Sequence, residues 1–208
     1  MDIKLSKNKI QGSIGAPPSK SLTIRSYAAA LLAGGSTPVL NYSRCADAES
    51  ALEIIRCFGA DVLREENYLI IKGAERLKPV DIFCGESGLN ARLFGIIGLL
   101  TGDRFELTGK GSIMQRKLTD LQLLFLSLGI MCGSNGGYLP FTVEGSLKGG
   151  EFVFDGSQGS QVLSGLLFAL PLIGQDSLIW LQNVTSRPYI DMTTDLLSEF
   201  GIEIENNN

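Results

Sequence analysis

The stretch GAPPSKSLTIR, residues 15–25, sets two serines, a lysine and an arginine just ahead of an apolar run, SYAAALLAGG, at 26–35. An apolar run that ends in glycine is typical of a buried helix, because glycine readily closes the last turn in a left-handed conformation. The start of a helix carries unpaired N–H groups and a partial positive charge, which favour an anion. The stretch therefore predicts a buried helix whose start brings Lys20, Ser21 and Arg25 together, either as a helix cap or as part of a site for a negatively charged ligand.

Composition limits the classes of protein that fit. The chain has 208 residues, 44% of them hydrophobic, which suits one domain or two small ones. A net charge of -4 argues against general nucleic-acid binding, which needs a dense cationic face. The absence of histidine excludes serine–histidine and histidine–metal chemistry, and four cysteines without a CxxC pair predict reduced thiols, with neither a metal site nor a disulfide.

The sequence also predicts a cytoplasmic protein. Its first residues, MDIKLSKNKI, are polar and alternating, unlike a signal peptide. No apolar run approaches the roughly 20 residues that a membrane-spanning helix needs. We therefore expect no membrane partner.

An internal repeat organises the chain. The tripeptides FGA (58–60), LGI (128–130) and FGI (200–202) each close an apolar helical pattern, and their glycines are 70 and 72 residues apart. Such a period is too long for a solenoid and suits a duplicated small α/β unit. We place the three units at about 14–83, 84–150 and 151–208, the last incomplete because the chain stops at EIENNN before a closing hairpin.

Each unit follows the same order of expected elements. Apolar helices are expected at 26–35, 90–103 and 160–176, β-rich segments at 37–42, 104–109 and 177–184, second helices at 47–59, 119–129 and 191–201, and hairpins at 60–73 and 130–145. The first helix of each unit is apolar nearly all round and should be buried, whereas the second is amphipathic, with Asp47 as the expected N-cap in unit one. These patterns predict an α/β (α+β) pseudo-threefold domain of βαβαββ units, with apolar helices inside and sheets and amphipathic helices outside.

The three apolar helices open on similar sequences. PPSKS (17–21), CGESGLNAR (84–92) and DGSQGSQ (155–161) are rich in glycine and serine, which can cap a helix without any ligand. Their recurrence in phase, together with Lys20, Arg25, Arg92 and Gln161, favours a shared site for a small polyanionic metabolite.

Two further cationic stretches precede the second helices. GSIMQRKLTD (111–120) carries Arg116 and Lys117, and TSRPYIDMT (185–193) carries Ser186, Arg187 and Tyr189. Pro188 fixes the local chain direction and so aims Tyr189. The arginines and the lysine fit a ligand site or a solvated surface equally well, whereas Arg44 is expected in a surface salt bridge.

Four motifs resemble those of the 5-enolpyruvylshikimate-3-phosphate synthase (3-phosphoshikimate 1-carboxyvinyltransferase) family. PPSKSLTIR (17–25) is similar to its P-G-S-K-S-x-x-x-R signature, and GESGLNAR (85–92) to its G-N-A-G-T-A-x-R loop. DGSQGSQVLSGLL (155–167) and TSRPYIDMT (185–193) are similar to its S-S-Q and S-K-P-Y-I-D-x-T segments. The motifs occur in order over essentially all 208 residues.

The resemblance implies two similar domains, each built of three βαβαββ units with the helices inside. Residues 14–208 would form the N-terminal substrate-binding domain, and residues 1–13 would belong to the partner domain. The family's acidic proton-transfer residues come from its C-terminal domain, which would lie outside this chain. We therefore expect this chain alone to bind substrate weakly and to be inactive.

The activity that the resemblance implies is a transfer step of the shikimate pathway, in aromatic amino acid biosynthesis. The enolpyruvyl group of phosphoenolpyruvate moves to the 5-hydroxyl of shikimate 3-phosphate through a tetrahedral ketal phosphate, phosphate leaves, and no metal or organic cofactor takes part. By motif position, Lys20 would contact both substrates. The residues that would bind shikimate 3-phosphate are Lys20, Ser21, Arg25, Ser160, Gln161, Ser186 and Tyr189. Those that would bind phosphoenolpyruvate are Lys20, Gly88, Arg92, Arg116 and Gln161.

The chain departs from the family pattern at five positions: Pro18 for glycine, Glu86 and Leu89 for the asparagine and threonine of the loop, Lys117 for proline, and Gly159 for the first serine of S-S-Q. Glu86 would bring a negative charge close to a phosphorylated acid, so neither phosphoenolpyruvate affinity nor glyphosate sensitivity is predicted. Two alternatives stay open: a UDP-N-acetylglucosamine enolpyruvyl transferase, whose opening resembles G-x-K-N-A, and a non-catalytic anion-binding relative of the same fold.

Overall fold

The computed structural model describes residues 3–4, 6–9 and 11–206. Unit one comprises helix α1 (Lys20–Leu32), strand β1 (Ser36–Leu40), helix α2 (Ala46–Phe58) and the hairpin β2 (Asp61–Arg64) and β3 (Tyr68–Lys72). The three strands form an antiparallel sheet in the order β1-β3-β2. The predicted hairpin at 60–73 is therefore confirmed.

Unit two has the predicted βαβαββ order in full, including a leading strand that unit one lacks among its described residues. It comprises β4 (Ile82–Phe83), α3 (Gly88–Gly98), the 3-10 turn η1 (Leu99–Thr101), β5 (Phe105–Thr108), η2 (Gly111–Gln115), α4 (Thr119–Ser127), β6 (Met131–Asn135) and β7 (Tyr138–Glu144). Its sheet has the order β4-β5-β7-β6, in which β4 runs parallel to β5 and the other neighbours are antiparallel. The second predicted hairpin is confirmed as well.

Unit three contains the same helices with a smaller sheet. It comprises β8 (Gly150–Asp155), η3 (Gly156–Gln158), α5 (Gln161–Ala169), η4 (Leu170–Leu172), β9 (Ser177–Gln182) and α6 (Arg187–Glu199). β8 and β9 pair in parallel over their whole length. No strand follows α6 up to residue 206, the last described residue.

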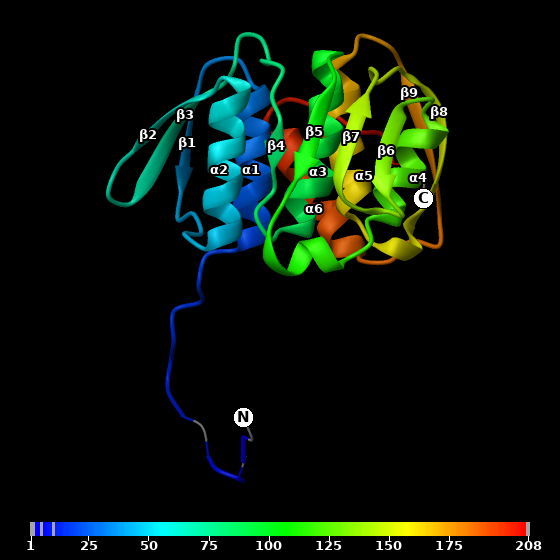
Figure 1. The fold of residues 1–208 in the computed structure, drawn as a ribbon. Helices are drawn as coiled ribbons and strands as arrows, with labels where there is room; N and C mark the ends of the chain where they lie inside the picture. Colours follow the sequence, from blue (N-terminus) through cyan, green and yellow to red (C-terminus); the bar gives the residue numbers. More distant parts are fainter. Residues whose placement is uncertain (1–2, 5, 10, 207–208) are drawn as a thin grey trace.

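The helices occupy the interior and the sheets lie outside (Figure 1), as the repeat predicted. The apolar helices α1, α3 and α5 are largely buried, and they contribute most of the core. One large ring from each of five helices is almost fully buried: Tyr27, Phe58, Phe94, Phe125 and Phe168. None of the helices among the described residues is long and apolar enough to span a bilayer.

Two of the three second helices have one buried and one exposed face, as their amphipathic pattern predicted. α2 buries Leu52 and exposes Glu53, and α6 buries Leu196 and exposes Asp195. α2 packs against α1 and α3, and α6 packs against α1 and α5. α4 is not amphipathic in the expected way, since Leu123 and Leu126 are 60% and 53% exposed. The amphipathic pattern is therefore confirmed for α2 and α6 and wrong for α4.

Helix boundaries differ from the sequence prediction at specific residues. The N-cap of α2 is Cys45, and Asp47 lies within the first turn, so the Asp47 cap was wrong. The C-cap of α1 is Ala33 in an extended conformation, and not the left-handed glycine that was expected. α3 and α5 instead continue as 3-10 turns, after which Gly102 (φ 73) and Gly174 (φ 63) take the left-handed conformation.

The segment before α1 has no regular secondary structure in its described part. In Figure 1 this part runs away from the body of helices and sheets, and Ile14 is 95% exposed. Met1, Asp2, Leu5 and Ile10 of the segment that was assigned to a partner domain, and the final Asn207 and Asn208 of unit three, lie outside the described residues. The division into 1–13 and 14–208 therefore stays a prediction.

Candidate functional site

A cleft of about 700 Å³ opens at the end of the domain where the helices begin. Residues at the start of each of the six described α-helices line it, so their N-terminal ends all face the same space. Each helix end adds a partial positive charge and N–H groups that have no partner within the helix. Five cationic side chains but only two carboxylates also line the cleft, so its walls favour a polyanion.

The cleft contains all ten residues that were predicted from the sequence. They are Lys20, Ser21, Arg25, Gly88, Arg92, Arg116, Ser160, Gln161, Ser186 and Tyr189. Lys117 and the substituted residues Glu86, Leu89 and Gly159 line it too, whereas Arg44 lies elsewhere, over the ring of Tyr42. The sequence prediction missed Asp47, Ser87, Ser112, Ile113 and Leu118.

The serines at the helix starts serve in part as caps. Ser19 Oγ accepts a hydrogen bond from the Leu22 N–H at 3.2 Å, and Ser87 Oγ accepts one from the Asn90 N–H at 3.3 Å. Ser160 is the N-cap of α5, but its side chain makes no capping bond. The capping explanation therefore accounts for Ser19 and Ser87, and it leaves Ser21 and Ser160 on the cleft wall without that role.

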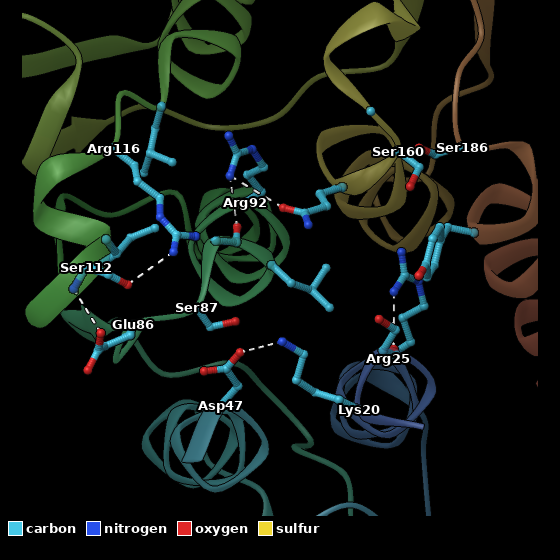
Figure 2. A pocket seen from close by; sticks show the side chains of 18 of the residues that line it. Lys20, Arg25, Asp47, Glu86, Ser87, Arg92, Ser112, Arg116, Ser160 and Ser186 are labelled. Atoms are coloured by element: carbon cyan, nitrogen blue, oxygen red, sulfur yellow. Dashed lines mark hydrogen bonds and ion pairs between the residues drawn. The ribbon is translucent and has the colours of Figure 1, made fainter. Parts of the chain in front are cut away.

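Lys20 and Asp47 form an ion pair on one side of the cleft (Figure 2). Lys20 Nζ lies 2.7 Å from Asp47 Oδ2, and the two side chains are 49% and 22% exposed. The side-chain amide of Asn90, in the first turn of α3, donates to the backbone carbonyl of Asp47 at 2.9 Å. The starts of α1, α2 and α3 are thereby linked through one carboxylate residue.

Arg25 lies at the floor of the cleft and is 1% exposed. Its guanidinium donates to Thr193 Oγ1 at 2.8 Å, to Ser164 Oγ at 2.9 Å and to the Ser21 carbonyl at 3.2 Å, and it lies 5.8 Å from the centre of the Tyr189 ring. Burial lowers the pKa of this guanidinium from 12.5 to about 10, and the nearby Tyr189 partly offsets that shift. Arg25 therefore remains charged at neutral pH.

Arg92 is held by Asp120 in a two-pronged ion pair. Its Nε and Nη2 atoms lie 2.6 and 2.9 Å from the two carboxylate oxygens. The remaining Nη1 donates to the Gly88 carbonyl at 3.2 Å and to Gln161 Oε1 at 3.4 Å. A Cβ at position 88 would stand 3.0 Å from this Nη1 and 3.6 Å from Gln161 Oε1, so glycine at 88 leaves room for both side chains.

Glu86 faces the loop that carries Arg116. Its carboxylate accepts the Ser112 N–H at 2.8 Å, and Arg116 Nη2 donates to Ser112 Oγ at 3.2 Å. Figure 2 shows the three residues as one chain of contacts across the cleft from Lys20. The hydrogen bonds from Ser112 lower the pKa of the Glu86 carboxyl and hold this side chain against the loop.

Two backbone conformations among the motif residues of unit three are unusual. Ser186, the N-cap of α6, has φ 58 and ψ 33, a left-handed conformation that is uncommon for a residue with a side chain. Gly159 has φ 102 and ψ -176, which residues with a Cβ rarely adopt. The glycine that replaces the family serine therefore fits the local backbone.

The fold and the cleft together define a class: a repeat-built α/β domain whose helix starts and cations surround one polyanion-sized cavity. A sequence model of the family described as EPSP synthase (3-phosphoshikimate 1-carboxyvinyltransferase) matches residues 5–208. This chain belongs to that EPSP synthase family.

Curated relatives and solved structures agree with this assignment. The 3-phosphoshikimate 1-carboxyvinyltransferase of Clostridium perfringens (strain ATCC 13124) is 36% identical over 98% of this chain and 49% of its own, and that of Clostridium kluyveri is 32% identical over 99% and 49%. An EPSP synthase structure from Acinetobacter baumannii superposes with a TM-score of 0.81 at 22% identity, over 94% of this chain and 45% of that one. The predicted α/β fold is thereby confirmed, and the chain spans about half the length of the curated relatives it matches.

Proposed function

We propose that this chain forms the shikimate 3-phosphate side of an enzyme that transfers the enolpyruvyl group of phosphoenolpyruvate to the 5-hydroxyl of shikimate 3-phosphate. The observation that carries the proposal is the gathering of six helix starts and five cationic side chains around one cleft. The names of the relatives, 3-phosphoshikimate 1-carboxyvinyltransferase, supply the chemistry. Both proposed substrates are phosphorylated acids, which suit such a wall.

The proposed roles divide the cleft between the two substrates. Shikimate 3-phosphate binds at the starts of α1, α5 and α6, through Lys20, Ser21, Arg25, Ser160, Gln161, Ser186 and Tyr189. Phosphoenolpyruvate binds toward α3 and the Arg116 loop, through Lys20, Gly88, Arg92, Arg116 and Gln161. Arg92 has its Nε and Nη2 atoms on Asp120, so it acts on the ligand chiefly by orienting Gln161 with its Nη1.

The proposed chemistry is addition followed by elimination. The 5-hydroxyl oxygen bonds to C2 of phosphoenolpyruvate and loses its proton while C3 gains one, which gives a tetrahedral ketal phosphate. Loss of phosphate and of a methyl proton then restores the enol ether. The cations of this chain position the two acids and stabilise the negative charge that moves to the departing phosphate.

We further propose that the chain supplies one half of the complete site. The curated relatives are about twice as long as their matched regions, which leaves room for a C-terminal domain that provides the acidic proton-transfer residues. Residues 14–208 then form the substrate-binding domain and 1–13 the segment of its partner. The absence of a metal or organic cofactor and a cytoplasmic location are parts of the same proposal.

Titration calorimetry of the 208-residue chain tests this function. Shikimate 3-phosphate should bind measurably, and Lys20→Ala should abolish the response, because the lysine contacts the ligand directly. A response to a nucleotide sugar with indifference to shikimate 3-phosphate would favour the UDP-N-acetylglucosamine alternative. Turnover by this chain alone would contradict the proposed half-site, and a response to inorganic phosphate only would favour a non-catalytic anion-binding relative.

A further inference from the structure

A layer of buried polar side chains forms the floor of the cleft and the protein interior just beneath it. It consists of Arg25 in α1, Ser164 in α5 and Thr193 in α6, which are 1%, 1% and 0% exposed. Arg25 Nε donates to Thr193 Oγ1 at 2.8 Å and Nη2 donates to Ser164 Oγ at 2.9 Å, while the two hydroxyl oxygens are 3.0 Å apart. We call these three residues the buried node.

Each residue of the node follows a cleft residue by four positions, about one helical turn. The pairs are Ser21 and Arg25, Ser160 and Ser164, and Tyr189 and Thr193. In every pair the node side chain donates back to the carbonyl of the cleft residue, at 3.2 Å from Arg25, 2.9 Å from Ser164 and 2.8 Å from Thr193. The node thus joins the first turns of three helices at one buried point.

The hydrogen bonds of the node do not neutralise the positive charge of Arg25. Each of the two hydroxyls has one proton, for which a backbone carbonyl and the other hydroxyl are both in reach, and both oxygens accept from the guanidinium. Among the residues that the structure describes, no carboxylate forms an ion pair with Arg25. A buried cation that is met only by neutral acceptors is costly, and an anion bound above it would lower that cost.

We propose that Ser164 and Thr193 are positioning residues for the shikimate 3-phosphate site. They hold the Arg25 guanidinium and fix the spacing of α1, α5 and α6, so that Ser21, Ser160 and Tyr189 meet one ligand together. The inference rests on the proposed function, and it adds two residues that touch no substrate. A ligand that spans several helix starts depends on that spacing, whereas inorganic phosphate can settle on one helix start and does not.

The test compares Thr193→Val, which removes the hydroxyl and keeps the shape, with Thr193→Ser, which keeps the hydroxyl. Thr194→Val is the matched control, because the Thr194 hydroxyl donates to the Asp191 carbonyl at 3.0 Å on the same helix. Calorimetric titration of the 208-residue chain with shikimate 3-phosphate should show about tenfold weaker binding for Thr193→Val, the order of a lost hydrogen bond to a charged group. Inorganic phosphate should bind all variants within about twofold, and Thr193→Ser and Thr194→Val should match the unmodified chain.

Three results would overturn the inference. Thr193→Val could bind shikimate 3-phosphate as well as the unmodified chain, or lose both ligands equally, or lose no more than Thr194→Val does. If Thr193→Val does not fold, Ser164→Ala carries the same expectation, since alanine is well tolerated in a helix. If the unmodified chain does not bind shikimate 3-phosphate, the proposed function is wrong and the inference is wrong with it. If the unmodified chain binds and Thr193→Val binds equally well, only the inference is wrong.

Discussion

Lys20 Nζ lies 2.7 Å from Asp47 Oδ2, so the cation expected to touch both substrates shares its charge with a carboxylate of the neighbouring helix. The two residues are 27 positions apart, and the contact exists because α1 and α2 begin at the same end of the domain. An anion that approaches Lys20 must share the lysine with Asp47. Asp47 therefore sets how strongly this corner of the cleft attracts negative charge.

Replacing Asp47→Asn should strengthen the binding of inorganic phosphate. One negative charge removed a few ångströms from the ligand gives about a threefold to fivefold gain at low salt, which shrinks as added salt screens the charges. Titration at two salt concentrations measures both effects. Glu53→Gln is the matched control, because Glu53 pairs with Arg56 away from the cleft and its replacement changes the net charge equally. Equal gains from both variants would contradict a local role for Asp47.

Replacing Arg92→Met should destabilise the fold by about 3 kcal/mol, since Asp120 would keep a largely buried charge without its partner. The side chains of this pair are 17% and 9% exposed. Urea unfolding measures the loss. Arg56→Met should cost under about 1 kcal/mol, because its pair with Glu53 is exposed to solvent. A double change, Arg92→Met with Asp120→Leu, should recover most of the stability, and a failure to recover would show that the ion pair is not the cause.

Replacing Gly111→Ala should be costlier than replacing Gly102→Ala. Both glycines have positive φ, 59 and 73, so both changes carry a backbone cost of about 1 kcal/mol. A Cβ at 111 would also stand 2.4 Å from the Glu86 carboxyl carbon, whereas nothing lies within 4 Å at 102. The added cost at 111 is the displacement of the Glu86 carboxylate and the loss of its bond from the Ser112 N–H. Urea unfolding should find this added cost absent when Glu86 is also changed to Ala.

The four cysteines should react with iodoacetamide at very different rates at pH 8. Burial raises the pKa of the Cys84 thiol from 9.0 to about 12 and that of Cys132 to about 11, so neither forms much thiolate. Cys45 and Cys57 are exposed and should be labelled first, which mass spectrometry can follow. Rapid labelling of Cys84 in the folded chain would contradict its buried position.

The Cys84 shift also sets a dependence of stability on pH. Above pH 9.0 the thiol of the unfolded chain ionises while the folded chain keeps its proton until about 12. The unfolded state is therefore favoured, and the free energy of unfolding should fall as the pH rises through this window. Cys84→Ser would keep a small side chain, and the free energy of unfolding of this variant should fall less between pH 8 and pH 10 than that of the unmodified chain. Urea unfolding at the two pH values measures the difference.

Sequence reasoning predicted the parts of this protein that depend on local pattern. The three buried helices and two hairpins were predictable because apolar runs recur with a period near 70. The ten cleft residues were predicted because the polar motifs near the helix starts resemble those of the EPSP synthase family. Helix boundaries were harder to predict, because several neighbouring residues can occupy the N-cap position. In α2 this position is taken by Cys45 and not by Asp47.

The features that were missed are long-range contacts. The Lys20 and Asp47 pair, the Arg92 and Asp120 pair and the bond from Arg25 to Thr193 join residues 27, 28 and 168 positions apart. No local pattern indicates such partners. One signal was available for the buried node, because Ser164 interrupts the apolar sequence QVLSGLLFAL one turn after the start of α5. A hydroxyl on a helix without a polar face needs a partner inside the protein.

The bond between Arg25 and Thr193 has a consequence for the order of folding. It connects the first helix to the last across 168 positions, so it can form only when units one and three have come together. Units one and two each contain a helix pair and a hairpin whose contacts are local and can form earlier. The contacts at the floor of the cleft can form only once α6 is present. On a ribosome, the first helix therefore leaves the exit tunnel before Arg25 can reach Thr193, and this contact forms only after α6 has left the tunnel as well.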